Sequence, residues 1–399
     1  MTSRGRSVVA LGLVVYLAAW AFGSKPLYPV AAGLLLAVGF AWAWVHVANG
    51  PFRVHRNLGE REHLEGDDVQ IACAVEPSGL VPPAVAALVE QVGGLGEQRH
   101  LLRRRGRRLA ITYVLANVRR GRYVFEQSHV EVSDPFGLQR VNAPLPAPGA
   151  LLVYPRLVEL DRLFSESGAH ALEGRRLLMR RPTGFDLHSV REYEQGESLR
   201  HVHWRSTARR GRLMVKELED APRDEIAVVL DADRTAVAGE SFDVQVRAAG
   251  SILQAYLRRG RRAVLVVNAE RRESQEVHSP AAESRRALEL LAGVEPTGRT
   301  PVHTVLSEET SAAARALEVV VVTARVDRAL VDRLVQRALS RRKASIVYID
   351  APTFAGAQPH REPALLRLGA AGVAVAVVRA GDDLAGALEG EHVAEAIRA

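Results

Sequence analysis

The first fifty residues carry two long apolar runs. Ser7–Gly23 and Leu27–Ala48 contain no Asp, Glu, Lys or Arg, and a short segment around Lys25 separates them. At the rise of an α-helix the first run spans roughly 25 Å, which is near the lower limit for crossing a bilayer. Aromatic rings favour the two membrane interfaces, and here they lie towards the ends of the runs, at Trp20, Tyr28, Trp42 and Trp44. The pattern predicts a transmembrane helical hairpin over residues 1–50.

The charged flanks of the hairpin predict its orientation. Arg4 and Arg6 precede it and Arg53 and Arg56 follow it, whereas the turn carries only Lys25. Because positive residues remain on the cytoplasmic side, both ends are expected in the cytosol of a bacterial cell, with the hairpin crossing the cell membrane twice. A cleaved signal peptide is the alternative, and the second apolar run argues against it.

Residues 51–150 show short alternating segments that are separated by turn residues. In Asp68–Glu76 the apolar side chains occur at every second position, and Ala110–Leu115, Tyr123–Phe125 and Val130–Val132 also have the composition of strands. Such short strands with frequent glycine and proline turns predict a β-sandwich domain.

Residues 223–399 alternate short apolar strands with amphipathic helices. The expected strands are Glu225–Leu230, Ala263–Val267, Val319–Thr323, Ser345–Ile349 and Val373–Val378, and the expected helices between them are Phe242–Arg259, Ala281–Leu291, Asp327–Arg341 and Pro363–Leu368. This order predicts an α/β domain with a parallel sheet that is covered on both faces. Ligand sites in such sheets lie beyond the carboxyl ends of the strands, where Asp231 follows the first strand.

Composition changes this picture only slightly. The net charge is +7, and almost all positive residues are arginines. The single cysteine, Cys73, excludes an intramolecular disulfide framework. The basic run from Arg99 to Arg108 could contact nucleic acid or anionic lipid, but no aromatic residues interleave with it to stack on bases. A solvated hairpin tip is the favoured interpretation, and no nucleic-acid partner is expected.

The segment 151–222, which joins the two predicted domains, combines charged residues with aromatic ones. It contains a stretch of the form G-x-x-x-x-S-x-R-E-Y-x-x-G-E, followed by R-x-V-x-W-x-x-T-A-R and L-x-V-K-x-x-E. The principal residues of this signature are Gly184, Arg191, Tyr193, Gly196, Arg200, Trp204, Ala208 and Arg209. Arginines and glutamates here can form charge-assisted pairs, and Trp204 is expected to be buried as an anchor at the domain junction.

In this signature the chain resembles the bacterial family called domain of unknown function 58. Asp134-Pro-Phe-Gly-Leu138 and Arg120-Gly-Arg-Tyr123 also look like that family, and the resemblance covers most of the chain. Glu197 stands where the family usually has Asp, and Leu187 where Phe is common. The resemblance implies a von Willebrand factor A-like, Rossmann-like domain after the signature. It also implies two partners, a MoxR-type AAA+ ATPase and a transglutaminase-like membrane protein, in an assembly role without a catalysed reaction.

A degenerate cation site is expected within the α/β domain. Asp231, Asp233 and Thr235 stand where a metal-ion-dependent adhesion site has D-x-S-x-S, and Thr323 and Asp327 could add oxygens. Oxygen ligands of this kind suit Mg²⁺, yet Asp233 replaces the first serine. Arginine is the alternative counter-charge for the two carboxylates, with Arg234 and Arg325 nearest.

Three functions therefore stay open. The favoured one is a membrane-anchored scaffold that binds proteins and is not an enzyme. A metal-dependent membrane-bound hydrolase using Asp231 and Asp233 is the second, although no P-loop, G-x-S-x-G or H-E-x-x-H motif occurs. The third is a lipid-binding or nucleic-acid-binding protein that uses Arg99–Arg108. A metal site at His201 and His203 has weak support from its spacing alone.

Overall fold

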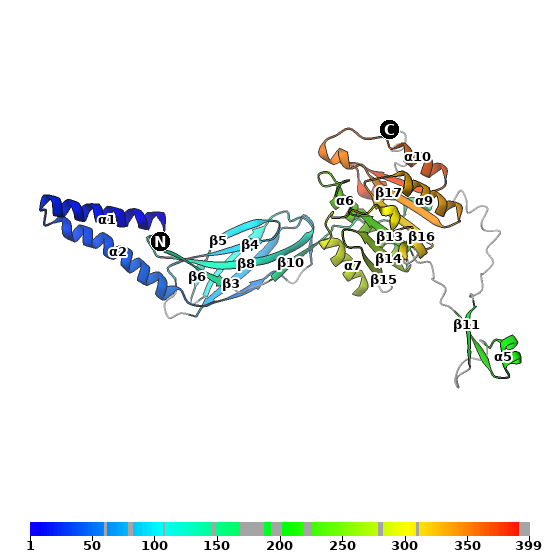
Figure 1. Cartoon of the computed structure of the whole chain (residues 1–399), viewed down its shortest axis with the longest axis horizontal. Helices are drawn as coiled ribbons and strands as arrows, with labels where there is room; N and C mark the ends of the chain where they lie inside the picture. Colours follow the sequence, from blue (N-terminus) through cyan, green and yellow to red (C-terminus); the bar gives the residue numbers. More distant parts are fainter. Residues whose placement is uncertain are drawn as a thin grey trace. The chain divides into compact units, whose positions relative to one another are not determined.

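The chain divides into two compact units, Met1–Arg156 and Leu157–Ala399. Figure 1 shows the computed structural model with its elements labelled. It describes residues 1–59, 62–78, 83–106, 108–145, 149–167, 187–192, 202–218, 226–277, 282–308 and 311–390.

The first unit begins with the two predicted apolar helices, α1 (Ser3–Phe22) and α2 (Leu27–Ala48). Thr2 caps α1, because its side-chain oxygen accepts a hydrogen bond from the Gly5 amide at 3.1 Å. Gly23 ends α1 with a φ of 64°, a conformation that favours glycine. Both helices are long and apolar enough to cross a membrane, and many of their large apolar side chains are exposed, Leu17 and Phe40 among them.

Two sheets follow the hairpin in the same unit. The first has the strand order β1-β3-β7-β6 and is antiparallel, with β1 Phe52–Asn57, β3 Val69–Pro77, β6 Arg103–Arg105 and β7 Arg108–Leu115. The second has the order β2-β10-β8-β4-β5, and β9 also pairs with β8. Its strands are β2 His63–Leu64, β4 Val85–Val92, β5 Gly96–Leu101, β8 Gly121–Ser133, β9 Arg140–Leu145 and β10 Gly149–Tyr154.

The two sheets contribute to one hydrophobic cluster. Ile71 and Cys73 of β3 belong to the same cluster as Leu88 of β4 and Phe125 of β8. The predicted alternation along β3 is confirmed, since its buried residues are Val69, Ile71, Cys73 and Val75.

The expectation of separate strands at Tyr123–Phe125 and Val130–Val132 is wrong, because both belong to the single strand β8. Its register against β4 shifts between Gln91 and Val92, so that Glu126 is an extra residue. A bulge of this kind reverses which positions face the core. Tyr123 and Phe125 are therefore buried before it, and Val130 and Val132 after it, which made one strand resemble two.

The second unit contains a small hairpin segment and an α/β sheet. In the hairpin segment, β11 (Leu187–Glu192) pairs antiparallel with β12 (Met214–Leu218), and the short helix α5 (Trp204–Arg210) lies between them in sequence. The sheet has the order β15-β14-β13-β16-β17-β18. Its strands are β13 Ile226–Asp231, β14 Ala263–Asn268, β15 Glu273–Val277, β16 Glu318–Thr323, β17 Lys343–Ile349 and β18 Ala374–Val378.

This strand order is that of a doubly wound fold, with a reversal between β13 and β16. The strands are parallel apart from β15, which runs antiparallel to β14. The predicted parallel sheet is thus confirmed for five strands of the described chain, whereas the polar edge strand β15 was not expected. Its sequence, Glu-Ser-Gln-Glu-Val, lacks the apolar run by which the other strands were found.

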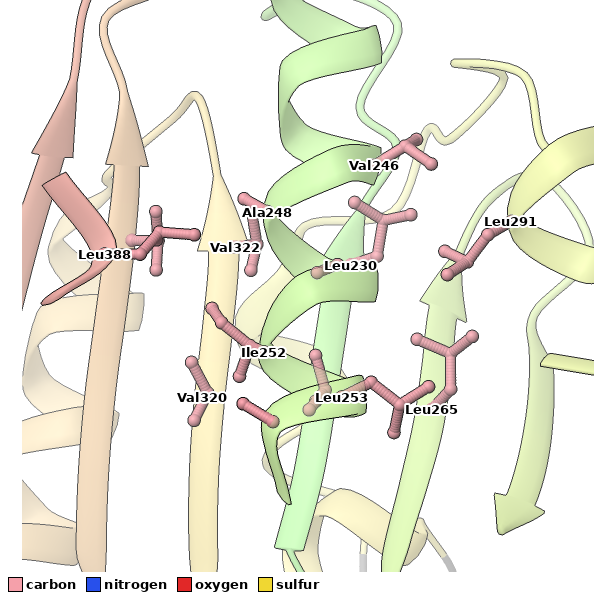
Figure 2. Close-up of a cluster of buried hydrophobic side chains, with 14 of the residues drawn as sticks. Leu230, Val246, Ala248, Ile252, Leu253, Leu265, Leu291, Val320, Val322 and Leu388 are labelled. Carbon is pink, nitrogen blue, oxygen red and sulfur yellow. The ribbon is translucent and has the colours of Figure 1, made fainter. Parts of the chain in front are cut away.

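Helices bury both faces of the sheet, as expected. On one face, Val246, Ile252 and Leu253 of α6 pack against Leu230 and the neighbouring strands (Figure 2). On the other, a second cluster joins Val229 to residues of α8, α9 and α10. Besides α5, the helices in the described part of this unit are α3 Phe164–Ser167, α6 Ser241–Arg258, α7 Ala282–Gly293, η3 Val302–Thr304, α8 Ala312–Arg315, α9 Arg328–Leu339, η4 Ala351–Ala355, α10 Pro363–Ala370 and α11 Leu384–Glu389.

Candidate functional site

Polar side chains gather where the strand order reverses. Asp231 ends β13 and Thr323 ends the adjacent parallel strand β16, so the two residues meet at the carboxyl edge of the sheet. Thr323 Oγ1 donates a hydrogen bond to Asp231 Oδ2 at 2.8 Å. Asn268, at the end of β14, donates from Nδ2 to the other carboxylate oxygen at 3.1 Å. Three neighbouring strand ends therefore build one polar cluster, which we call the β13 edge cluster.

Asp231 is the buried centre of the β13 edge cluster, with 4% of its surface exposed. Burial raises the pKa of its carboxyl to about 6, against the hydrogen bonds from Asn268 and Thr323, which lower it. The charges of Asp233 and Asp327 act in the same direction as burial. Both hydrogen-bond donors are neutral, so the ionised carboxylate has hydrogen-bond partners but is not neutralised by them.

Asp233 and Thr235 form the outer part of the cluster. Asp233 Oδ1 accepts hydrogen bonds from the Thr235 amide at 2.8 Å and from its hydroxyl at 2.7 Å. Arg325 Nη1 lies 3.3 Å from Asp233 Oδ2 and 3.4 Å from Thr235 Oγ1. Burial acts to raise the pKa of Asp233, but the bonds from Thr235 and the Arg325 charge outweigh burial and lower it. Arg325 is thus the counter-charge in this loop.

The loop itself is held by backbone contacts to Gly298. The Gly298 amide donates to the Ala232 carbonyl at 2.8 Å, and the Arg234 amide donates to the Gly298 carbonyl at 3.1 Å. A Cβ at residue 298 would lie 2.6 Å from the Asn268 carbonyl oxygen and 2.8 Å from that of Ala232. Only glycine allows this approach, which fixes Asp233 beside the sheet edge.

The Asp327 carboxylate makes its contacts away from the centre of the β13 edge cluster. It is the N-cap of α9, since its Oδ1 accepts from the Leu330 amide at 2.6 Å. Its Oδ2 lies 3.3 Å from His303 Nδ1. Sequence reasoning did not identify Asn268, His303 or Gly298 as part of this edge, because each comes from a loop or strand end whose partner is distant in sequence.

An arginine supplies the positive charge beside Asp233 in this arrangement. Each oxygen of Asp231 accepts a hydrogen bond, and the Asp233 carboxylate faces the Arg325 guanidinium. Hard cations need several oxygen lone pairs that converge on one point. Within the described residues, His, Cys, Asp and Glu form no group of three that could hold a metal.

The structure describes four of the eight signature residues, Arg191 in β11 and Trp204, Ala208 and Arg209 in α5. Arg191 is in β11 opposite Val215, and Ala208 and Arg209 lie on exposed positions of α5. Gly184, Tyr193, Gly196 and Arg200, with His201, lie outside the described residues. His203 caps α5, with its Nδ1 3.2 Å from the Ser206 amide.

The expected burial of Trp204 at a domain junction is wrong. Trp204 is the first residue of α5 and is 67% exposed. Val202 and Met214 are buried in its place, at 3% and 4% exposed, and the His203 amide donates to the Met214 carbonyl at 2.7 Å. The buried apolar side chains next to α5 are therefore those of Val202 and Met214, while the indole lies on the surface.

Comparison with known proteins agrees with the signature. A 155-residue part of the chain is 26% identical to the "Uncharacterized protein YeaD" of Bacillus subtilis (strain 168), which is 39% of this chain and 38% of that relative. The chain therefore matches well under half the length of that relative. The profile of the family described as "Protein of unknown function DUF58" matches residues 189–394, from β11 to beyond α11.

Two solved structures resemble parts of the chain. BatB, a conserved hypothetical protein from Bacteroides thetaiotaomicron, covers 44% of this chain and 99% of its own length, with 11% identity and a TM-score of 0.29. A von Willebrand factor type A protein from Catenulispora acidiphila covers 46% of this chain and 44% of its own length, with 14% identity and a TM-score of 0.28. TM-scores this low carry no functional argument. The family match, which spans more than half of the sequence, places this chain in the DUF58 family.

Proposed function

We propose that this chain is a membrane-anchored scaffold that binds another protein through its second unit and catalyses no reaction itself. The observation that carries the proposal is the exposed indole of Trp204 on α5. Tryptophan and arginine are enriched among residues that dominate binding energy at protein interfaces. Trp204 stands next to Arg205, and Arg209 and Arg210 follow on exposed positions of the same short helix.

The membrane part of the proposal rests on α1 and α2. Their exposed apolar side chains need a partner that water does not provide, and a lipid bilayer supplies it. Arg4, Arg6, Arg53 and Arg56 favour cytosolic placement of both flanks by the positive-inside rule. Within the first unit we also propose a two-sheet sandwich, since both sheets contribute to one cluster.

The proposed partner is a MoxR-type AAA+ ATPase, with a transglutaminase-like membrane protein as a second member of the assembly. The support for both partners is the resemblance of the signature to the family, which implies these proteins as frequent genomic neighbours. We further propose that the β13 edge cluster uses Arg325, not Mg²⁺, to balance the charge of Asp233.

The two alternative functions have less support. A hydrolase needs an accessible catalytic carboxylate, and Asp231 is 4% exposed. In the basic run, Arg99 and Arg108 already pair with Glu131 and Glu76.

A capture experiment tests the proposal. The tagged full chain, solubilised in detergent, is immobilised and exposed to the purified MoxR-type ATPase of the same host. Trp204→Ala is expected to reduce the captured ATPase at least tenfold, because truncating an interface hot spot costs about 2 kcal/mol or more. Leu339→Ala is the matched control, as Leu339 is 77% exposed but lies at the end of α9. Equal capture by the wild type and Trp204→Ala would contradict the proposed surface, and capture by neither would contradict the partner.

A further inference from the structure

The loop between β8 and β9 holds an exposed phenylalanine in a fixed turn. Asp134, 1% exposed, accepts hydrogen bonds from the Phe136 amide at 2.8 Å and from the Gln139 amide at 2.6 Å. The Gly137 amide donates to the Asp134 carbonyl at 3.1 Å. Phe136 itself is 72% exposed. The backbone of the turn is therefore held by its own hydrogen bonds, and the Phe136 ring is exposed on it.

This turn is bonded to the start of the apolar hairpin. Thr2 Oγ1 donates to the Gly137 carbonyl at 2.7 Å, and the Thr2 amide donates to the Leu138 carbonyl at 3.1 Å. The approach is so close that a Cβ at Gly5 would lie 2.2 Å from the Leu138 oxygen. The first turn of α1 and the β8–β9 turn thus form one local structure.

Leu138 shows how far along the hairpin this turn reaches. Its side chain clusters with Val38 and Ala41 of α2, and Val8 and Val9 of α1 pack against the same cluster. Ala41 precedes the end of α2 by seven residues, or about 10 Å of helix. The β8–β9 turn therefore lies alongside the apolar part of the hairpin and not beyond its end.

Residues that prefer a membrane interface surround this level of the hairpin. Trp42, next to Ala41, is 55% exposed, and tryptophan is enriched at the boundary between lipid and water. Arg4 and Arg6 are exposed on the first turns of α1. Arg4 Nη1 lies 3.9 Å from the position of a Cβ at Gly137. Arginines at this depth can reach the phosphates of lipid headgroups.

We propose that the β8–β9 turn is a third membrane contact, in which Phe136 inserts into the interfacial layer of the bilayer. The inference rests on the proposed membrane insertion of α1 and α2. A bilayer fits the surface because the exposed Phe136 ring stands in the same turn as Leu138, which packs on apolar residues of α1 and α2, and because Arg4 and Arg6 are exposed on the first turns of α1. The contact would fix the orientation of the first unit on the membrane surface.

Site-specific labelling of the full chain in liposomes of phosphatidylcholine and phosphatidylglycerol tests the contact. An environment-sensitive maleimide dye is attached to Phe136→Cys, Val114→Cys or Phe40→Cys, and quenching by nitroxide lipids is compared with quenching by aqueous iodide. The native Cys73 does not compete, because it is 2% exposed and burial raises the pKa of its thiol to about 11. Val114 is the matched control, because it is 53% exposed. It pairs with Gln70, near one end of β3, whereas Phe52, the first residue of β1 after α2, pairs with Pro77 at the other end.

The expected result is at least twofold quenching by nitroxide lipids at residues 136 and 40, and quenching by iodide alone at residue 114. Iodide quenching alone at residue 136, with lipid quenching at residue 40, would overturn the third contact and leave the hairpin intact. Iodide quenching at residue 40 would overturn both the hairpin and the contact. If Phe136→Cys does not fold, Pro135→Cys gives the same measurement, since Pro135 is an exposed neighbour in the turn.

Discussion

Two buried carboxylates, Glu90 in the first unit and Asp231 in the second, are stabilised in opposite ways. Glu90 is fully buried and pairs with the Arg56 guanidinium, while Tyr113 donates from its hydroxyl to Glu90 Oε2 at 2.6 Å. Among the described residues, the donors that bond to the Asp231 carboxylate are the neutral side chains of Asn268 and Thr323. The full ion pair belongs to the interior of the β region and holds strands together. The carboxylate without a direct cationic partner lies at the sheet edge where ligands of doubly wound folds bind.

The largest expected effect comes from breaking the Glu90 pair. Arg56→Met should lower the free energy of unfolding by about 3–5 kcal/mol, because it leaves a buried carboxylate without a counter-charge. Thermal unfolding of the detergent-solubilised chain measures the effect, and the double variant Arg56→Met with Glu90→Leu is the control. The double variant should recover most of the free energy of unfolding that the single variant loses. A single variant that unfolds at the wild-type temperature would mean that two hydroxyl donors suffice to hold Glu90, Tyr113 and Ser128, whose Oγ lies 3.4 Å from Glu90 Oε1.

Asp231→Asn should stabilise the folded chain at neutral pH, whereas Arg56→Met should destabilise it. The pKa of Asp231 in the folded chain, about 6, lies above its ordinary value of 3.8. The wild type therefore loses stability as pH rises from 4 through 6, and the Asn variant does not. Above pH 7 the free energy of unfolding of the variant should exceed that of the wild type by about 3 kcal/mol. The reason is that raising a pKa by about two costs about 1.36 kcal/mol for each unit. Below pH 4 the two proteins should unfold alike. Denaturation curves at pH 4 and pH 8 make the comparison, and a variant that is less stable at pH 8 would refute it.

Removing Arg325 should have a smaller effect on stability but should change the response to metal. Arg325 is exposed, so Arg325→Ala should lower stability by about 1 kcal/mol or less. Without the guanidinium, Asp233 loses the positive charge beside it, and Mg²⁺ should then raise the melting temperature by binding the folded state. The wild type should respond neither to millimolar Mg²⁺ nor to EDTA. A shift in the wild type would show that the native loop does bind a cation.

Trp204→Ala should have the smallest effect on stability. An indole that is 67% exposed contributes little to a core, and surface substitutions usually change stability by about 0.5 kcal/mol or less. The melting temperature should stay constant while partner capture falls. A loss of about 3 kcal/mol or more would instead indicate a buried ring.

Much of the fold could be predicted from local periodicity. The strands β13, β14, β16, β17 and β18 were found because each is an apolar run buried on both faces. The strand β15 was missed because it is polar, and β8 was divided in two because the bulge at Glu126 shifts its periodicity. Both failures come from pairing between strands, which a local pattern does not contain.

The candidate site was predictable only in part. Asp231, Asp233, Thr235 and Thr323 were found from their positions after strands, and Arg325 was one of two arginines expected as a counter-charge. Asn268 and Gly298 act through chain segments that only folding brings together. For Trp204, the residue type suggested burial, but the buried side chains next to α5 are those of Val202 and Met214.

One edge of the α/β sheet restricts how a partner can bind. β15 carries Glu273, Ser274 and Gln275 on largely exposed positions of one edge, and charged side chains there oppose the addition of another strand. Recognition by β-augmentation, in which a peptide extends a sheet through main-chain hydrogen bonds, is therefore disfavoured at this edge. A partner that binds there must recognise side chains, so its specificity will depend on individual residues and will be open to change by single substitutions.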